Sequence, residues 1–92
     1  MGTLPLIFTD TFAASYREVP ERDVPQINEW LDQLEQHHDQ PDLRYMIRIG
    51  DDRLFATGRI YAPTGVYRIT WTYDDKKHPT AIACILVASL ET

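Results

Sequence analysis

The chain has 92 residues, of which 43% are hydrophobic and 25% are charged, and its formal net charge is −5. This composition is that of an ordinary globular protein and excludes an intrinsically disordered chain. Because a chain of this length can bury only one modest core, we expect residues 1–92 to form a single domain. No apolar run approaches the roughly 18 residues of a membrane-spanning helix, and the N-terminus has no basic segment followed by an apolar one. We therefore expect a cytoplasmic protein with no membrane partner.

The charges are distributed unevenly along the chain. Residues 1–42 carry nine acidic side chains and two arginines, which gives −7, whereas residues 43–92 carry seven basic and five acidic side chains, which gives +2. A net negative charge argues against indiscriminate binding to nucleic acid, but it does not exclude a local basic surface. Acidic side chains on the solvated faces of the expected helices account for the negative charge of the first half. We therefore expect a functional surface in the second half.

Two short elements open the chain. Residues 4–8 form an apolar stretch with Pro5 near its start, which predicts a short edge strand. Thr9 or Asp10 can cap the helix that follows. Apolar residues recur at helical spacing in this helix: Phe12, Ala13 and Tyr16. The Val-Pro pair at 19–20 ends it.

A longer helix is expected next. Asp23 is a suitable N-cap, and Pro25 suits the first helical turn. The apolar residues then follow the i, i+3, i+4, i+7 pattern: Ile27, Trp30, Leu31 and Leu34. His37 and His38 mark its C-terminal end, where positive charge complements the helix dipole. The two helices together are expected to form a helical hairpin.

The hydrophobic period changes from 3.6 to 2 at Leu43, which indicates that the chain leaves helix for sheet. Alternation predicts strands over three ranges: 43–49, 54–62 and 66–73. Residues 81–88 are apolar at both parities, which is typical of a central strand, and we expect Cys84 within it to be a buried structural thiol. The sequence therefore predicts an α+β fold with an N-terminal strand, a two-helix hairpin and an antiparallel sheet of about four strands.

The strand alternation also predicts a surface rich in arginine. If the apolar side of every strand faces the helices, the opposite side of the sheet carries four arginines and two aromatic residues: Arg44, Arg48, Arg59, Arg68, Phe55 and Tyr61. Guanidinium groups bind phosphate through paired hydrogen bonds, and aromatic rings stack on nucleobases. The alternative is an ordinary solvated sheet face, on which arginine and threonine are common.

Other polar groups predict turns and helix ends. His37 and His38 are adjacent, so their side chains point apart, and no second cluster completes a metal site. The aspartate pairs at 51–52 and 74–75 fall in predicted hairpin turns, where aspartate bonds to the local backbone. The glycines are isolated and form no phosphate-binding loop. We therefore expect neither a metal nor a cofactor.

The order of elements and several local motifs resemble the RelE/ParE superfamily of toxin–antitoxin toxins. The segments similar to that family's opening strand, first helix, helix break and entry into the sheet are 7–12, 15–17, 19–20 and 41–44. Arg59-Ile60 followed by Tyr67-Arg68-Ile69-Thr70-Trp71 resembles the family's paired arginine-bearing strands. The similarity covers about residues 6–88.

This resemblance implies a toxin that is made with a cognate antitoxin. Ribosome-dependent members cleave mRNA by promoting attack of a ribose 2′-hydroxyl on the adjacent phosphate without a metal, whereas members of the ParE branch inhibit a protein target. By position, Arg59 and Arg68 match the family's sheet arginines, so the resemblance assigns them phosphate binding and transition-state stabilisation. The remaining expected nucleic-acid contacts come from Arg44, Arg48, Phe55 and Tyr61.

The end of the chain departs from the family pattern. Nuclease-type members carry further basic, histidine or tyrosine residues just after the last strand, whereas this chain ends Ala88-Ser89-Leu90-Glu91-Thr92. No group there can shuttle a proton at neutral pH. Two functions therefore remain open. One is a toxin that cleaves mRNA or inhibits another target, and the other is a catalytically silent module that binds a protein or nucleic acid through the arginines or the acidic hairpin.

Overall fold

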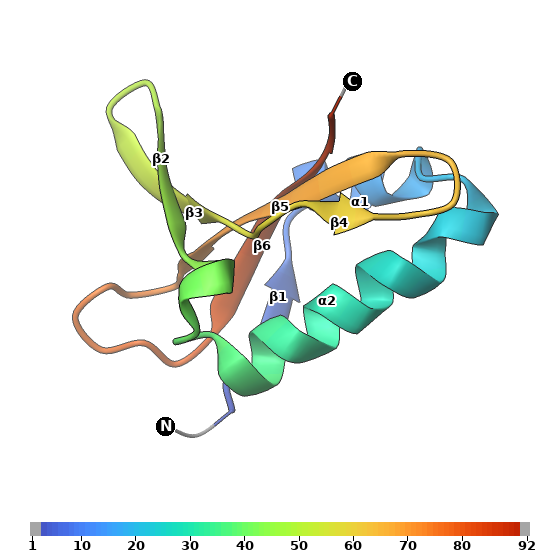
Figure 1. Ribbon diagram of the computed structural model, residues 1–92. Coiled ribbons are helices and arrows are strands. Elements are labelled where there is room, and N and C mark those ends of the chain that lie inside the picture. Colours follow the sequence, from blue (N-terminus) through green and yellow to red (C-terminus); the bar gives the residue numbers. More distant parts are fainter. Residues whose placement is uncertain (1–2, 91–92) are drawn as a thin grey trace.

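A computed structural model describes residues 3–90, and Figure 1 shows their arrangement. The helical elements are α1 (Asp10–Arg17), the 3-10 turn η1 (Glu21–Asp23), α2 (Val24–His37) and the 3-10 turn η2 (Pro41–Leu43). The strands are β1 (Leu6–Phe8), β2 (Tyr45–Ile49), β3 (Asp52–Ala56), β4 (Ile60–Tyr61), β5 (Val66–Tyr73) and β6 (Ile82–Leu90). The predicted α+β class and both predicted helices are confirmed.

The six strands form one sheet in the order β1-β6-β5-β3-β2, with β4 paired to β5. β1 runs parallel to β6, and the other pairs are antiparallel. β6 is flanked by β1 and β5, as its continuous apolar sequence predicted. Figure 1 shows α2 lying across the sheet, whereas the hairpin of β2 and β3 projects away from α2.

Thr9 fixes the start of α1 and its position beside β6. The Thr9 hydroxyl accepts a hydrogen bond of 3.1 Å from the backbone N–H of Phe12, which confirms the predicted cap. The same hydroxyl donates to the carbonyl of Cys84 at 3.0 Å. Further along, the Ser15 hydroxyl accepts from the backbone N–H of Val87 at 2.9 Å. Helix α1 therefore supplies hydrogen-bond partners to the edge of β6 beyond the short β1 strand.

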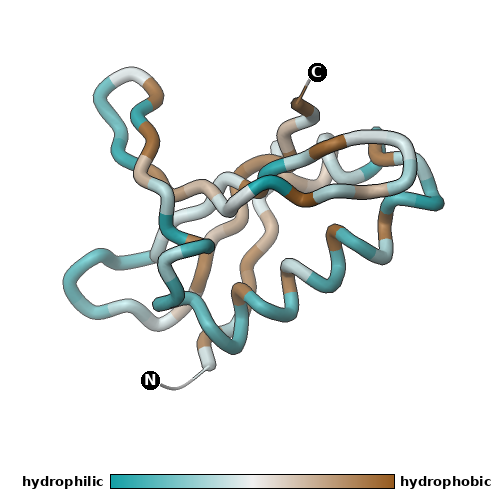
Figure 2. Tube along the Cα trace, viewed as in Figure 1, coloured by the Kyte–Doolittle hydropathy of each residue, from teal (hydrophilic) through white to brown (hydrophobic). Residues whose placement is uncertain are grey.

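Helix α2 follows the predicted hydrophobic pattern, with Ile27, Leu31 and Leu34 buried. In Figure 2, hydrophobic positions recur along α2 between hydrophilic stretches. Asp23 occupies the predicted N-cap position, but its side chain makes no cap hydrogen bond and turns instead to the 64–67 segment. Pro25 does lie in the first turn, as expected. Within residues 3–90, no helix is long and apolar enough to cross a membrane.

The core lies between the helices and one side of β5 and β6. Its fully buried members include Ile27 and Leu34 from α2 and Ile69 and Trp71 from β5. Complete burial of a large apolar side chain is worth about 1.5–3 kcal/mol. The indole Nε1 of Trp71 donates to the carbonyl of Leu43 at 2.7 Å, which attaches η2 to the centre of the sheet.

The strand expected at 54–62 is divided into β3 and β4. The Thr57 hydroxyl accepts a hydrogen bond from the N–H of Ile69 at 3.0 Å, so a side-chain oxygen takes the place of a carbonyl in the ladder. The N–H of Gly58 points away from β5 and donates to the carbonyl of Asp42 at 2.7 Å. These two hydrogen bonds interrupt the ladder, and the chain after the helical hairpin has five strands instead of about four.

A tight turn joins β2 to β3. Ile49 pairs with Asp52, which leaves Gly50 and Asp51 as a two-residue loop, and the φ angle of Gly50 is 63°. Glycine at the first loop position with positive φ is the signature of a type II′ hairpin turn. The predicted turn is confirmed. Met46 is 65% exposed on this hairpin, so the helices do not cover β2.

Strand β6 contains a bulge beside the core. Thr70 pairs with Leu86 and Trp71 with Cys84, so Ile85 is an extra residue on β6. Cys84 is fully buried, and burial raises the pKa of its thiol to about 12. A neutral, inaccessible thiol is structural, as the sequence predicted.

Candidate nucleic-acid interface

The pairing of β5 with its neighbours defines two sides of the sheet. Tyr67, Ile69 and Trp71 are buried and belong to the core cluster that contains the helices. Arg68 and Thr70 alternate with them and therefore lie on the other side. We call this other side, which carries Arg68, Tyr45 and Tyr61, the arginine face.

Arg68 is anchored at the centre of the arginine face. Its Nε donates to the carbonyl of Thr57 at 2.8 Å, and its guanidinium carbon lies 5.3 Å from the centroid of the Tyr45 ring. Tyr45 pairs with Ala56, which pairs with Thr70, so the strand register independently places Tyr45 on the same side as Arg68. The Nε bond and the cation–π contact fix the guanidinium while leaving its terminal nitrogens available to a ligand.

Arg59 and Tyr61 reach the arginine face from β4. Ile60 pairs with Tyr67 and is fully buried, whereas Tyr61 pairs with Val66 on the opposite side. Arg59 directly precedes β4, outside the paired residues, and has the same parity as Tyr61, so we infer that it projects from the same side. Arg59 is exposed, and Tyr61 is 69% exposed.

The resulting surface has two guanidinium groups and two tyrosine rings. Arginine presents planar donors that match phosphate oxygens, and an exposed ring offers a stacking surface for any base. Arg59, Tyr61 and Arg68 were predicted to share this side; the register places Tyr61 and Arg68 on it, and Arg59 has the parity of Tyr61. Tyr45 was assigned to the core side by its sequence parity, so sequence reasoning missed it as a member of the arginine face.

Arg44 does not lie on this face, which corrects the prediction. It follows η2 and is not part of β2. Its Nε donates to the carbonyl of His38 at 2.9 Å, its terminal nitrogen donates to the Tyr73 hydroxyl, and its guanidinium lies 5.8 Å from the Phe55 ring. Tyr73 and Phe55 lie on the core side of their strands. Arg44 therefore holds η2 against the sheet through its bonds to His38 and Tyr73, on the side opposite to Arg68.

Phe55 and Arg48 were also placed on the wrong side. Phe55 pairs with Trp71, and the two ring centroids are 4.8 Å apart, so Phe55 packs at the edge of the core. Met46 pairs with Phe55, and Arg48 shares the parity of Met46. Arg48 is exposed on the hairpin, on the side opposite to Arg68. For Arg48 the cause is the 3-10 turn before β2, because the buried Leu43 does not set the parity of the strand that follows. For Phe55 the cause is the interruption at Thr57, because the buried Ile60 does not set the parity of β3.

Asp23 forms a buried polar cluster that the sequence did not reveal. Its carboxylate accepts hydrogen bonds from the Thr64 N–H at 3.0 Å, from the Thr64 hydroxyl and from the Tyr67 hydroxyl at 2.7 Å. Burial alone would raise the pKa of Asp23, but these hydrogen bonds together outweigh it and hold the pKa below the ordinary value. Burial, and then the neighbouring carboxylate, raise the pKa of Tyr67. The cluster joins η1 to the β4–β5 turn.

The strand next to Arg68 offers no acid–base group. Ala88 pairs with Arg68, and Leu86 and Leu90 flank it on the same side of β6. Glu91 and Thr92 lie outside the described residues. The His38 Nδ1 lies 2.8 Å from the Tyr73 hydroxyl, on the core side. This part of the arginine face is therefore suited to binding a phosphate but has no side chain on β6 that could transfer a proton.

The remaining polar motifs have structural roles. Asp74 accepts hydrogen bonds from the backbone N–H groups of Thr80 and Ala81 at 2.9 and 3.0 Å, and the Thr80 hydrogen bonds hold its pKa well below the usual range. Asp75 accepts from the N–H of Lys77 at 2.9 Å. The predicted turn role of this aspartate pair is confirmed. Among residues 3–90, no group of three or more histidine, cysteine or carboxylate side chains is arranged to hold a metal.

Comparison with known proteins gives no family assignment. No protein-family model, curated protein or solved structure matches this chain.

Proposed function

We propose that this chain is a RelE/ParE-like protein of a toxin–antitoxin module that binds single-stranded RNA through its arginine face. The observation that carries the proposal is the register of β4 on β5, which puts Tyr61 on the same side as Arg68, with the exposed Arg59 next to β4 at the parity of Tyr61. In this arrangement Arg59 and Arg68 hold successive phosphates, and Tyr61 stacks on a base. The acidic first half limits binding elsewhere on the molecule.

The element order also supports the family part of the proposal. A strand, two helices and a meander follow one another, and the last strand returns beside the first. A groove of about 420 Å³ between the helices is lined mainly by apolar side chains, including Phe8, Phe12 and Leu31. Phe8 is 52% exposed there. Such a groove suits an apolar segment of an antitoxin, which is the partner that the family resemblance implies.

The proposed activity is binding without cleavage. Attack by a ribose hydroxyl needs a group that removes its proton and a group that protonates the leaving oxygen. The positions next to Arg68 on β6 are alanine and leucine. Arg44 donates a hydrogen bond to the Tyr73 hydroxyl on the other side of the sheet. Two arginines can stabilise charge on a bound phosphate, but they cannot serve as a base at neutral pH. The protein then acts by occupying RNA, on the ribosome or free.

Induced expression in bacteria tests this function. The variants are Arg59→Gln with Arg68→Gln, which removes the charges of the arginine face, and Arg48→Gln with Arg53→Gln, which removes two exposed charges from the opposite side of the hairpin. We expect the wild type and the hairpin variant to slow growth while cellular mRNA keeps its length. The arginine-face variant should grow normally at the same protein level.

Three results would count against the proposal. Unchanged growth on expression of the wild type would remove the toxin assignment. Equal growth arrest by the arginine-face variant would remove the site assignment. Shortened mRNA in the wild type, with full-length mRNA in the Arg59→Gln, Arg68→Gln variant, would replace binding with cleavage. If a small open reading frame beside the gene encodes an antitoxin, its co-expression should restore growth.

A further inference from the structure

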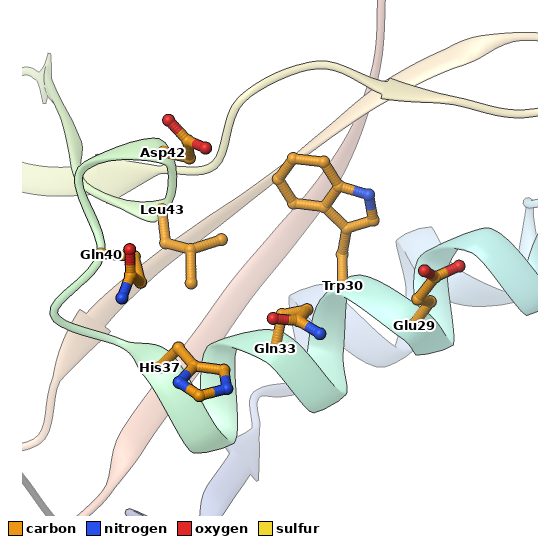
Figure 3. Close-up of a pocket in the computed structure, with 7 residues that line it drawn as sticks. All are labelled: Glu29, Trp30, Gln33, His37, Gln40, Asp42 and Leu43. Carbon is orange, nitrogen blue, oxygen red and sulfur yellow. The ribbon is translucent and has the colours of Figure 1, made fainter.

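A second hollow lies between α2 and η2, next to the backbone segment at Gly58. Its volume is about 470 Å³, which is in the range of small-ligand sites. The lining side chains come from both elements and the link between them: Glu29, Trp30, Gln33, His37, Gln40, Asp42 and Leu43. Figure 3 shows Trp30 rising from α2 toward η2, with Glu29 and Asp42 on either side of it.

Acidic side chains line this pocket. Glu29 and Asp42 are carboxylates, and no lysine or arginine is among the lining residues. Both side chains are exposed, and within residues 3–90 neither one takes part in a hydrogen bond or an ion pair. The pocket belongs to the half of the chain with a net charge of −7. Two carboxylates without partners beside a concave surface favour a cationic ligand.

The indole of Trp30 gives the pocket an aromatic wall in a fixed position. Trp30 is partly buried and packs against the core. Its Cη2 atom would lie only 3.5 Å from a Cβ atom at Gly58, so the backbone at Gly58 supports the far end of the ring. The N–H of Gly58 also donates a hydrogen bond of 2.7 Å to the backbone carbonyl of Asp42. One short backbone segment therefore positions both the aromatic wall and the turn that carries one carboxylate.

We propose that this pocket binds the side chain of an arginine from a basic segment of a partner protein. A guanidinium group is planar and can stack on the Trp30 ring, with its positive charge between the carboxylates of Glu29 and Asp42. The side-chain carbonyls of Gln33 and Gln40 can accept its remaining N–H groups. An ammonium group could use the carboxylates, but it has no planar face to match the indole. This inference does not depend on RNA binding, because the two sites share no side chain.

The test is a titration of the 15N-labelled protein with a glycine-arginine-glycine peptide blocked at both ends, followed by NMR. Trp30→Phe assigns the indole N–H signal of Trp30 and separates it from that of Trp71, which donates to Leu43 inside the core and reports the integrity of the fold. We expect a saturable shift of the Trp30 signal. The lysine peptide and spermidine should bind several-fold more weakly, because ammonium groups can use the carboxylates but not the indole face, and the citrulline peptide should cause no saturable shift.

Matched variants separate this site from general charge attraction. Glu29→Gln with Asp42→Asn should weaken arginine-peptide binding about tenfold. The control is Asp32→Asn with Asp39→Asn, which removes the same charge from exposed positions that do not line the pocket. We expect the control to bind within about twofold of the wild type, in the range of an exposed charge change. Equal weakening in both variants, equal binding of citrulline or spermidine, or no saturable shift would overturn the proposal.

Discussion

The hydroxyl of Tyr67 donates a hydrogen bond of 2.7 Å to the carboxylate of Asp23, across 44 positions of sequence. Asp23 is fully buried and ends η1, and Tyr67 is buried in β5. The bond ties the segment between the helices to the strand that carries Arg68. The position of the arginine face relative to the helices therefore depends on this contact.

Tyr67→Phe tests that contact. The change removes one hydrogen bond from a buried carboxylate while keeping the ring, so the free energy of unfolding should fall by about 1–3 kcal/mol. Tyr61→Phe is the matched control, because its hydroxyl is on an exposed side chain, and it should change stability by less than about 0.5 kcal/mol. Urea unfolding followed by circular dichroism measures both values. Equal stabilities of the two variants would show that the buried bond contributes little.

The lowered pKa of Asp23 predicts a loss of stability in acid. A carboxyl group whose folded pKa is below its unfolded value of 3.8 stabilises the protein above that pH, and this contribution disappears as the pH falls through the folded pKa. The difference in unfolding free energy between the wild type and Asp23→Asn should therefore narrow below about pH 3.8. Asp74 also has a lowered pKa, so Asp74→Asn must be measured beside it. A difference that stays constant with pH would contradict the assignment.

Arg44 is expected to affect stability and not RNA binding. Arg44→Gln removes the hydrogen bonds to His38 and Tyr73 and the cation–π contacts of the guanidinium, which should cost about 1–3 kcal/mol. Arg48→Gln, at an exposed position, should cost less than about 0.5 kcal/mol. Thermal unfolding and RNA titration of both variants provide the comparison. A large loss of RNA affinity in folded Arg44→Gln would show that Arg44 does contribute to the RNA interface.

Tyr61 is expected to act through its ring. Base stacking on an exposed aromatic side chain contributes about 1–3 kcal/mol, so Tyr61→Ala should weaken binding of single-stranded RNA about tenfold or more. Tyr61→Phe keeps the ring and should bind within about twofold of the wild type. Fluorescence anisotropy with a labelled oligonucleotide measures the affinities. If phenylalanine weakens binding as much as alanine does, the hydroxyl is the important group and stacking is not.

The sequence correctly predicted the two helices and the antiparallel arrangement of the later strands, because both depend on local patterns. Thr9 caps α1 and the apolar residues of α2 face the core, as the helical period indicates. The arginine face was only partly predictable, because alternation assigns sides correctly only while a strand is continuous. The turn before Tyr45 and the interruption at Thr57 each break the alternation, so the residues before and after them no longer follow one parity. The predicted side was correct for Tyr61 and Arg68 because both alternate with fully buried isoleucines, Ile60 and Ile69.

The long-range polar contacts could not be predicted from the sequence, for a different reason. Asp23 has every local property of a helix cap, yet its carboxylate binds Thr64 and Tyr67. Arg44 similarly has the parity of a surface strand residue, but it contacts Tyr73. In both cases the partner is far away in the chain, and no periodicity in the sequence specifies it. Such contacts follow from the tertiary packing that only the structure contains.

The most direct test of the RNA-binding face is the salt dependence of single-stranded RNA affinity for the wild type and for Arg59→Gln with Arg68→Gln. Each phosphate contact on a single strand contributes about 0.7 to the slope of log affinity against log salt concentration, so loss of two contacts should lower the slope by about 1.4. The control is Arg48→Gln with Arg53→Gln, which should keep the wild-type slope. We predict weaker binding with a reduced slope only in the arginine-face variant. An unchanged slope and affinity in that variant would contradict the proposed site.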